Sequence, residues 1–203
     1  AGDLHLGGID WTKMLIKAIA DQFTKGFGAD PRQGAESLQF LSLEAEQAKR
    51  SLTVRPKAAL TCQHGGHRKT YQVQLDQFER LCKPLVDRTM KITQEMLRDD
   101  TGKVRWGQVN VVLTTGGSSR MPMIRNLLKQ HSGTTLNTSL SPDLSISHGA
   151  TYYAGMLLTN NKFAKSILNS KASERLAKVK QRRVNARALG IMVRDMDSGK
   201  RVP

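Results

Sequence analysis

Apolar residues recur every three or four positions near the start of the chain, which is the spacing of helices that bury one face. We predict one helix that follows the glycine pair 7–8 and ends at the Gly/Pro-containing turn 26–31, and a second helix over residues 34–53. Their predicted core positions are Trp11, Met14, Leu15, Ala18, Ile19 and Phe23 in the first helix, and Leu38, Leu41, Ala45, Ala48 and Leu52 in the second.

A third and longer helical pattern runs from Asp76 to Met96. Asp76 is predicted to be its N-cap, because Glu79 follows at the spacing of a capping box. Pro84 lies inside the pattern and predicts a kink or a short break there.

Shorter apolar runs between turn residues predict strands. Residues 60–63 and 69–74 should form a hairpin, with 64–67 (His-Gly-Gly-His) as its loop. The elements expected after the third helix are a buried strand at 111–115, a helix at 122–130, a strand at 135–137 and a last helix capped by Asp143. The order is that of an α/β protein, with too few strands for a closed α/β domain.

The most informative segment is 116–122, Gly-Gly-Ser-Ser-Arg-Met-Pro, between the buried strand and a helix that Pro122 opens. Such a turn leaves backbone N–H groups free and lets a flat or anionic ligand approach closely. Arg120 adds a planar cation that can stack on an aromatic ring. The alternative is an ordinary structural turn.

A second candidate is a polar stripe on the predicted second helix, spaced at i, i+3, i+4 and i+7 and made of Glu46, Lys49, Arg50 and Thr53. Alone, such a stripe indicates a solvated face with a Glu46–Arg50 ion pair. The same acceptor, cations and hydroxyl could also line one wall of a nucleoside pocket.

Charge and cysteine content narrow the functional classes. The net charge is +15, and residues 161–203 hold 12 Lys and Arg against 3 Asp and Glu. Because Phe163 is the one aromatic residue of that tail, a solvated basic linker is favoured over a nucleic-acid platform. No apolar stretch is long enough for a membrane span, and the spacing of Cys62 and Cys82 indicates a reduced intracellular setting.

Three weaker candidates are interpreted as structural. His64 and His67 could bind a metal ion, but an ordinary polar hairpin is favoured because the sequence shows no evident third ligand. Cys82 should be a buried thiol. The methionines expected to fill gaps in the core are Met90, Met96, Met121 and Met123.

Four segments together resemble the seventy-kilodalton heat-shock protein (Hsp70) chaperone family. Residues 2–10, Gly-Asp-Leu-His-Leu-Gly-Gly-Ile-Asp, are similar to its Gly-Asp-x-His-Leu-Gly-Gly-x-Asp segment. Residues 46–53 resemble its Glu-x-Ala-Lys-x-x-Leu-Ser adenosine-site helix, and residues 116–122 its Gly-Gly-Ser-Thr-Arg-Ile-Pro adenine loop. Residues 142–150 carry its Pro-Asp and Gly-Ala pairs. The resemblance covers about residues 2–160, with the motifs in the family order.

This resemblance implies the C-terminal half of an actin-like ATPase domain, an α/β lobe with an incomplete ribonuclease H-like subdomain. The inner actin-like subdomain would comprise residues 1–7 and 83–160. An inserted outer α+β subdomain, with helices and a small antiparallel sheet, would comprise residues 8–82. Residues 161–203 would form a basic linker helix and the start of a β-rich peptide-binding domain.

By the same resemblance, Gly116, Gly117, Ser118 and Arg120 would form one side of an adenine-nucleotide site for ATP or ADP. Arg120 would stack on the base, and Asp143 would contact the purine edge, as implied by the family motif.

The opposite side of the site would come from one helix face, with Glu46, Lys49, Arg50 and Thr53 reaching the ribose. Gly7 and Gly8 would lie near the ribose and phosphates. Ile9 stands where the family usually has an acidic residue, which removes a polar contact there. Leu144 and His148 likewise replace an acidic and an aromatic residue.

The sequence contains neither of the family's phosphate loops, Asp-Leu-Gly-Thr-Thr and Asp-Leu-Gly-Gly-Gly-Thr. We therefore expect no catalytic residue, no metal site and no ATP hydrolysis by this chain alone, because phosphoryl transfer needs positioned phosphates, metal and water. Mg²⁺ would be bound only in the full-length protein.

The implied protein is a cytoplasmic ATP-dependent chaperone for protein folding and stress response. Its implied partners are unfolded polypeptide clients, a J-domain co-chaperone and a nucleotide-exchange factor, with no membrane and no nucleic acid. Two alternatives stay open at this point: a sugar-kinase-type member of the actin-like superfamily, and a non-catalytic actin-fold adaptor that binds nucleic acid through its basic tail.

Overall fold

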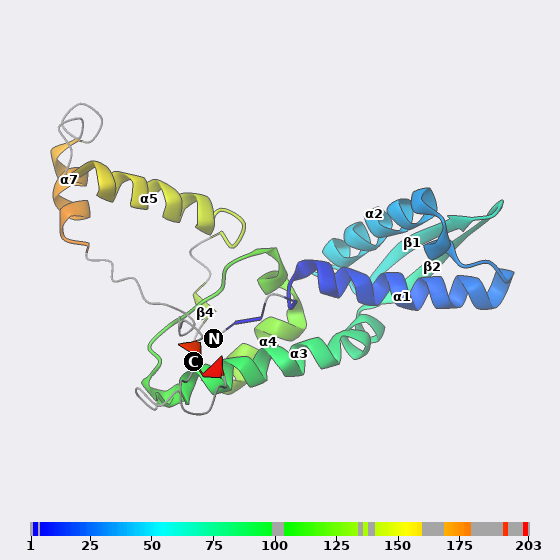
Figure 1. Ribbon diagram of the computed structural model, residues 1–203, viewed down its shortest axis with the longest axis horizontal. Helices are drawn as coiled ribbons and strands as arrows, with labels where there is room; N and C mark the ends of the chain where they lie inside the picture. The colour runs from blue at the N-terminus through cyan, green and yellow to red at the C-terminus, as the bar shows by residue number, and fades with distance from the viewer. Residues whose placement is uncertain are drawn as a thin grey trace. The chain divides into compact units, whose positions relative to one another are not determined.

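The computed structural model describes residues 2–3, 5–98, 104–133, 136–137, 141–159, 169–179, 193–194 and 201–202. The chain forms two compact units, Ala1–Ile146 and Ser147–Pro203. The helices and strands are, in order, α1 (Gly8–Phe27), α2 (Ala35–Leu52), β1 (Lys57–His64), β2 (His67–Gln74), α3 (Leu75–Leu97), β3 (Val112–Leu113), α4 (Pro122–Ser132), β4 (Leu136–Asn137), α5 (Ser145–Thr159), α7 (Ser170–Ala177), β5 (Val193–Arg194) and β6 (Arg201–Val202) (Figure 1). Three 3₁₀ turns are η1 (Pro31–Gln33), η2 (Trp106–Gln108) and η3 (Gly117–Arg120). The chain is therefore a mixed helix-and-sheet protein, as predicted at that level.

Both ends of α1 are fixed by local bonds. At its start, Asp10 Oδ2 accepts the Gly7 N–H at 3.0 Å, which satisfies a donor that the helix leaves unpaired. At its end, Gly28 adopts a left-handed conformation (φ 72°), and its N–H donates to the Thr24 carbonyl at 2.8 Å. The helix thus ends within the predicted turn.

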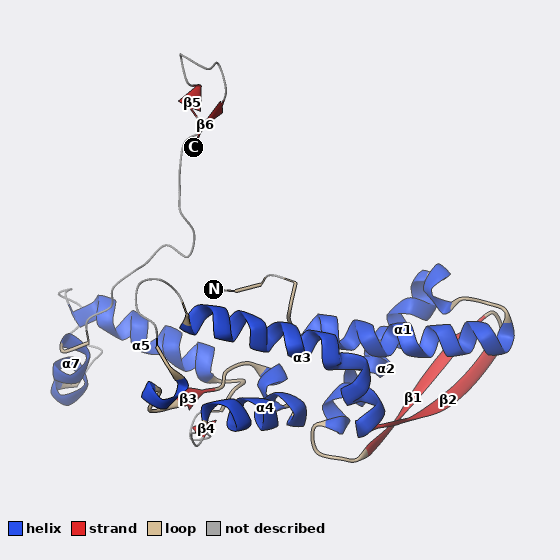
Figure 2. Cartoon of the chain, turned by 90° about the horizontal axis from the view of Figure 1, so that it is seen from below, coloured by secondary structure: helices blue, strands red, loops and turns tan. Residues whose placement is uncertain are grey.

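The strands β1 and β2 form an antiparallel hairpin in which His64 pairs with His67 (Figure 2). Its loop is therefore only Gly65 and Gly66, whose φ angles are 57° and 78°. Positive φ at both positions is what a two-residue type I′ turn requires. The hairpin was predicted, but the pairing reaches closer to the turn than expected.

The edge of β1 is covered by α2. Glu44 Oε2 on α2 accepts the Thr61 N–H at 2.9 Å, a backbone donor that faces away from β2. The helix therefore supplies a side-chain acceptor at a position where another strand would supply a carbonyl group.

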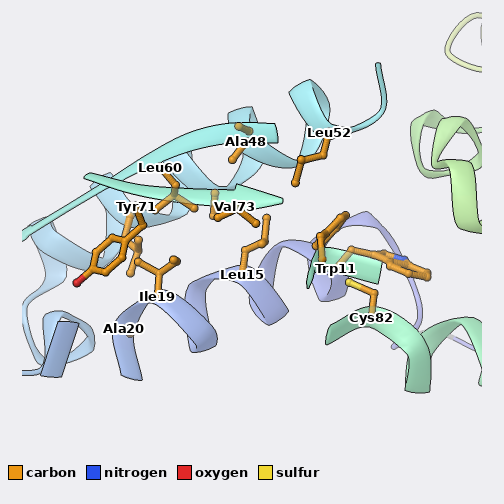
Figure 3. Close-up of a cluster of buried hydrophobic side chains, with 14 of the residues drawn as sticks. Trp11, Leu15, Ile19, Ala20, Ala48, Leu52, Leu60, Tyr71, Val73 and Cys82 are labelled. Atoms are coloured by element: carbon orange, nitrogen blue, oxygen red, sulfur yellow. The ribbon is translucent and has the colours of Figure 1, made fainter. Parts of the chain in front are cut away.

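The core lies between the hairpin and helices α1, α2 and α3 (Figure 3). Side chains of α1 and of the two strands face one another there. Fully or almost fully buried members include Trp11, Leu15, Ile19, Phe23, Leu41, Ala45, Ala48, Leu52, Leu60, Tyr71, Val73, Phe78 and Cys82. The predicted core faces of the first two helices are thus confirmed, with Met14, Ala18 and Leu38 half-buried.

Helix α3 departs from the prediction at its start. Its N-cap is Gln74, whose N–H donates to Gln77 Oε1 at 3.1 Å, so the predicted Asp76 cap is wrong. The physical reason is that β2 runs directly into the helix, and the Leu75 N–H is held by the Pro56 carbonyl. Asp76 instead pairs with Arg80 at 2.8 Å.

Helix α3 is also unbroken at Pro84, which lies exposed on its surface. The turns before and after it are anchored by buried Cys82 and Val86, which explains why the predicted break is absent. Met90 is buried as expected, but Met96 in the last turn is exposed and fills no gap in the core.

The strand predicted to be buried at 111–115 is shorter and more exposed. Among the described residues, Val112 and Leu113 pair in parallel with Leu136 and Asn137 of β4. Val111 and Leu113 are about half exposed, at 48% and 55%. Parallel strands are buried where other elements cover both faces of their sheet, and the exposure of Val111 and Leu113 shows that this cover is incomplete in the described residues.

In the second unit, α7 packs against α5 at Gly155. A Cβ on Gly155 would lie 2.7 Å from Leu176 Cδ1, so the glycine permits the close approach of the two helices. Strands β5 and β6 pair antiparallel. Residues 161–168, where the predicted basic linker helix would begin, lie outside the described residues.

Within the described part of the chain, no helix is both long enough and apolar enough to cross a membrane.

Candidate functional site

A cavity of about 850 Å³ opens in the first unit between α2 and the η3 turn. That volume lies within the usual range for a small-molecule site. The residues that line it are Gly8, Glu46, Lys49, Arg50, Thr53, Gly116, Gly117, Ser118, Arg120, Met121 and Asp143. The structure therefore brings together ten of the eleven predicted site residues, from segments as far apart in the sequence as Gly8 and Asp143.

The α2 wall is built on a buried lysine. Lys49 Nζ donates to the Gly8 carbonyl at 2.9 Å, to Thr12 Oγ1 at 3.0 Å and to Glu46 Oε2 at 2.5 Å. Thr12 Oγ1 in turn lies 2.7 Å from Glu46 Oε2, to which it donates. All three ammonium protons of Lys49 are thus used within the protein, and they tie α2 to the first turn of α1.

The same wall presents a second cation to the cavity. Arg50 is exposed, and its Nε donates to Glu46 Oε1 at 3.0 Å. Thr53 follows as the C-cap of α2, and its hydroxyl donates to the Arg50 carbonyl at 2.7 Å. The expected Glu46–Arg50 pair is therefore present, but it borders a cavity rather than a plain solvated face.

Glu46 accepts bonds on both carboxylate oxygens, and these set its charge. Partial burial raises the pKa of Glu46, but the bonds from Lys49, Thr12 and Arg50 outweigh that effect and lower the pKa to about 2. The carboxylate is therefore charged at neutral pH.

The opposite wall is the η3 turn, which depends on Gly116. Its φ of 79° and ψ of 151° belong to a backbone region that residues other than glycine essentially never adopt. Its N–H donates to the Pro142 carbonyl at 2.8 Å, and its carbonyl accepts from Ser119 Oγ at 2.7 Å. The glycine turn is thus attached to the segment that carries Asp143.

Arg120 and Asp143 form an ion pair at the mouth of the cavity. Arg120 Nε and Nη2 both donate to Asp143 Oδ2, at 3.1 and 2.6 Å. Asp143 stands two residues before the first residue of α5, so the helix begins later than its predicted cap position. A Cβ on Gly117 would lie 3.4 Å from Asp143 Oδ1, which places that glycine against the pair.

The two walls approach most closely at Gly8. A Cβ at this position would lie 2.9 Å from Ser118 Oγ and 3.6 Å from Lys49 Nζ. Gly8 therefore permits the close contact between the start of α1 and the η3 turn.

Two residues fall outside the prediction. Gly7 does not line the cavity, because its N–H is turned toward Asp10 at the helix start. Met121 lines it and was expected only as a core methionine; its side chain is almost fully buried, at 1% exposure. Its place between Arg120 and Pro122 was the available signal, since a residue next to a turn that lines the cavity can contact both the core and the cavity.

The remaining candidates are structural in the described residues. His64 Nδ1 lies 3.0 Å from Ser37 Oγ, and the His67 ring stacks on Phe27 with centroids 4.7 Å apart. No group of three metal-ligating side chains occurs among the residues that the structure describes. Cys62 and Cys82 are both free and buried.

Comparison with known proteins adds an independent observation. A family model described as Hsp70 protein matches residues 1–170. Heat shock 70 kDa protein 7, chloroplastic, of Arabidopsis thaliana is 34% identical over 164 residues, which cover 77% of this chain and 22% of that protein. Chaperone protein DnaK of Metamycoplasma hominis is 30% identical over 163 residues, covering 77% of this chain and 27% of that protein. The chain thus spans about a quarter of the length of these curated relatives.

Proposed function

Because this chain belongs to the Hsp70 family, we propose that its cavity is the adenosine side of an ATP or ADP site in a chaperone ATPase. In this proposal, the first unit is part of an actin-like ATPase lobe, and residues 8–82 are its inserted outer subdomain.

The observation that carries the proposal is the composition of the cavity. Two arginines, Arg50 and Arg120, border it from opposite walls, and the glycines Gly8 and Gly117 line it without adding a side chain. Guanidinium groups stack favourably on aromatic rings, and glycine lets a flat ring approach the backbone. These properties suit a purine base.

We propose that the ribose lies against the α2 wall, and that its binding changes the hydrogen bonds of Lys49. Since Lys49 already donates three hydrogen bonds, a ribose hydroxyl would have to replace one of its protein acceptors. The polar surface that a bound ribose meets first is therefore the exposed side chain of Arg50.

We further propose that this chain alone does not hydrolyse ATP, because its sequence has no phosphate loop to hold the γ-phosphate and metal. In the whole protein, ATP would control the binding of unfolded polypeptides, together with a J-domain co-chaperone and a nucleotide-exchange factor. A cytoplasmic location is part of the same proposal.

Calorimetric titration of the 203-residue chain with ADP tests the proposed site. We expect binding to the wild-type chain that weakens about tenfold in Arg120→Ala, because a stacked cation is removed from the base. Arg125 is exposed on α4 and does not line the cavity. Arg125→Ala removes an equal charge there and should bind ADP like wild type. Equal affinity of wild type and Arg120→Ala, or no binding by either, would reject the assignment.

A phosphate-release assay tests the proposed lack of catalysis. The chain incubated with ATP and Mg²⁺ should release no more phosphate than buffer does. Release that is lost in Arg120→Ala and kept in Arg125→Ala would contradict this part of the proposal.

A further inference from the structure

Asp143 is bound to Arg120, and both side chains line the cavity. Its Oδ2 accepts two hydrogen bonds from one edge of the Arg120 guanidinium, at 2.6 and 3.1 Å. The two side chains are about half exposed, so this is a contact at the cavity mouth rather than a buried core pair. Oδ2 of Asp143 is thus shared by two donors of Arg120, while Oδ1 lies on the side of Gly117.

The backbone holds the two partners in register. The Gly116 N–H donates to the Pro142 carbonyl at 2.8 Å, next to Asp143 in the sequence. The Leu144 and Ser145 N–H groups donate to the Ser141 carbonyl, which fixes the turn that carries Asp143. The carboxylate therefore sits at a defined place relative to the η3 turn and restricts where Arg120 can point.

The opposite wall has the same arrangement. Arg50 Nε donates to Glu46 Oε1 at 3.0 Å, and Glu46 is itself fixed by Lys49 and Thr12. Each wall thus carries an arginine whose Nε is bound by a carboxylate. Both arginine side chains stay partly exposed, at 77% for Arg50 and 48% for Arg120, so a ligand in the cavity can reach them.

We infer that Asp143 is a positioning residue that acts through Arg120 and makes no direct contact with the bound base. This inference rests on the proposed function, and it revises the purine-edge contact that the family motif implied. Asp143 holds the guanidinium in its stacking orientation before the ligand arrives, so less side-chain freedom is lost on binding.

A double-mutant cycle separates positioning from direct contact. The proteins are wild type, Asp143→Asn, Arg120→Ala and the double variant, each titrated with ADP. Asp143→Asn should weaken binding about threefold, the size expected for an exposed ion pair. In the Arg120→Ala background the same change should have no further effect. An equal loss in both backgrounds would overturn the inference, because a direct contact does not need Arg120.

Asp87→Asn is the matched control, because Asp87 forms an exposed ion pair with Lys83 on α3, outside the cavity. It should bind ADP like wild type. A threefold loss in this variant as well would overturn the inference by showing an effect of charge alone.

A ligand-independent measurement keeps this test separate from that of the proposed function. The Arg120 Nε–H resonance should exchange slowly with water in the wild-type chain and faster in Asp143→Asn, with Asp87→Asn unchanged. Equal exchange in wild type and Asp143→Asn would overturn the positioning role even if ADP binds. Absence of ADP binding together with the expected exchange difference would reject the proposed function and retain the orientation of Arg120 by Asp143.

Discussion

Lys49 Nζ lies 2.9 Å from the carbonyl oxygen of Gly8, and this bond joins the last turn of α2 to the first residue of α1. Lys49 is a buried charge whose other acceptors, Thr12 and Glu46, are also protein groups. Lys49→Met would leave these acceptors without their donor. We expect it to lower the free energy of unfolding by about 2–3 kcal/mol.

Urea unfolding followed by circular dichroism measures this effect. Lys91→Met is the control, because Lys91 is exposed on α3 and its ion pair with Glu95 is long, at 3.9 Å. This control should change stability by less than about 0.5 kcal/mol. Similar losses in the two variants would show that the Lys49 network adds little.

Glu46 should make stability depend on acidic pH. Its pKa is lowered to about 2 in the folded chain from an ordinary value of 4.5. A carboxyl group whose pKa is lowered by folding stabilises the folded state at pH values above its pKa in the unfolded chain. This stabilisation is lost as the pH falls to its pKa in the folded chain. The window is therefore about pH 4.5 to 2.

The measurement is the difference in unfolding free energy between wild type and Glu46→Gln at several pH values. The wild-type advantage should be constant above pH 5 and shrink progressively below pH 4.5. A difference that stays the same down to pH 2.5 would contradict the lowered pKa.

The hairpin loop should tolerate asparagine better than alanine. Gly65 has a φ of 57°, where alanine is strained and asparagine is often found. Gly65→Ala should lower the free energy of unfolding by about 1 kcal/mol, and Gly65→Asn by clearly less. Gly26→Ala in α1, where a Cβ meets open space, should stabilise by up to about 1 kcal/mol. Thermal unfolding of the three variants distinguishes these signs, and equal effects of the two Gly65 changes would contradict the turn assignment.

The two thiols should be unreactive in the folded chain. Burial raises the pKa of Cys62 to about 11 and the pKa of Cys82 to about 12, so both stay protonated at pH 8. A colorimetric thiol reagent should therefore modify neither cysteine in buffer and both in 6 M guanidinium. Fast modification of a single thiol in buffer would identify one that is less buried in solution.

The second unit should depend on Gly155. Valine at this position would place side-chain carbon against Leu176, whose Cδ1 is only 2.7 Å from an added Cβ. We expect Gly155→Val to separate α7 from α5 and to speed proteolysis within Ser170–Ala177. Gly149→Val on the same helix has no atom within 4 Å of an added Cβ and should leave the cleavage rate unchanged.

The spacing of apolar residues was sufficient to predict the helices that pack against elements close to them in the sequence. The apolar spacing in α1 and α2 identified Leu15, Phe23, Leu41 and Leu52 as core residues, and all four are buried. These positions could be predicted because hairpin and helices close a core within about eighty residues. The start of α3 could not be predicted in this way. It depends on a hydrogen bond from the Leu75 N–H to the Pro56 carbonyl, which forms only when the hairpin is folded.

The candidate site could be predicted as a set of residues but not as a network. The stripe on α2 and the glycine turn were visible as motifs, and the cavity brings them together. The sequence did not indicate that Thr12 would join Lys49 to Glu46, or that Asp143 would hold Arg120, because those partners lie 23 to 37 residues apart. The exposure of Val111 and Leu113 was equally hidden, since it depends on how much sheet surrounds the strand.

The bond between Glu44 and the Thr61 N–H also limits how this hairpin can aggregate. A foreign strand could add to β1 only after displacing α2 from that edge, so intermolecular pairing would have to begin at β2. There the exposed side chains of Arg68 and Lys69 would meet their own copies in a second molecule. Charge repulsion would then oppose growth at the one edge that α2 leaves uncovered.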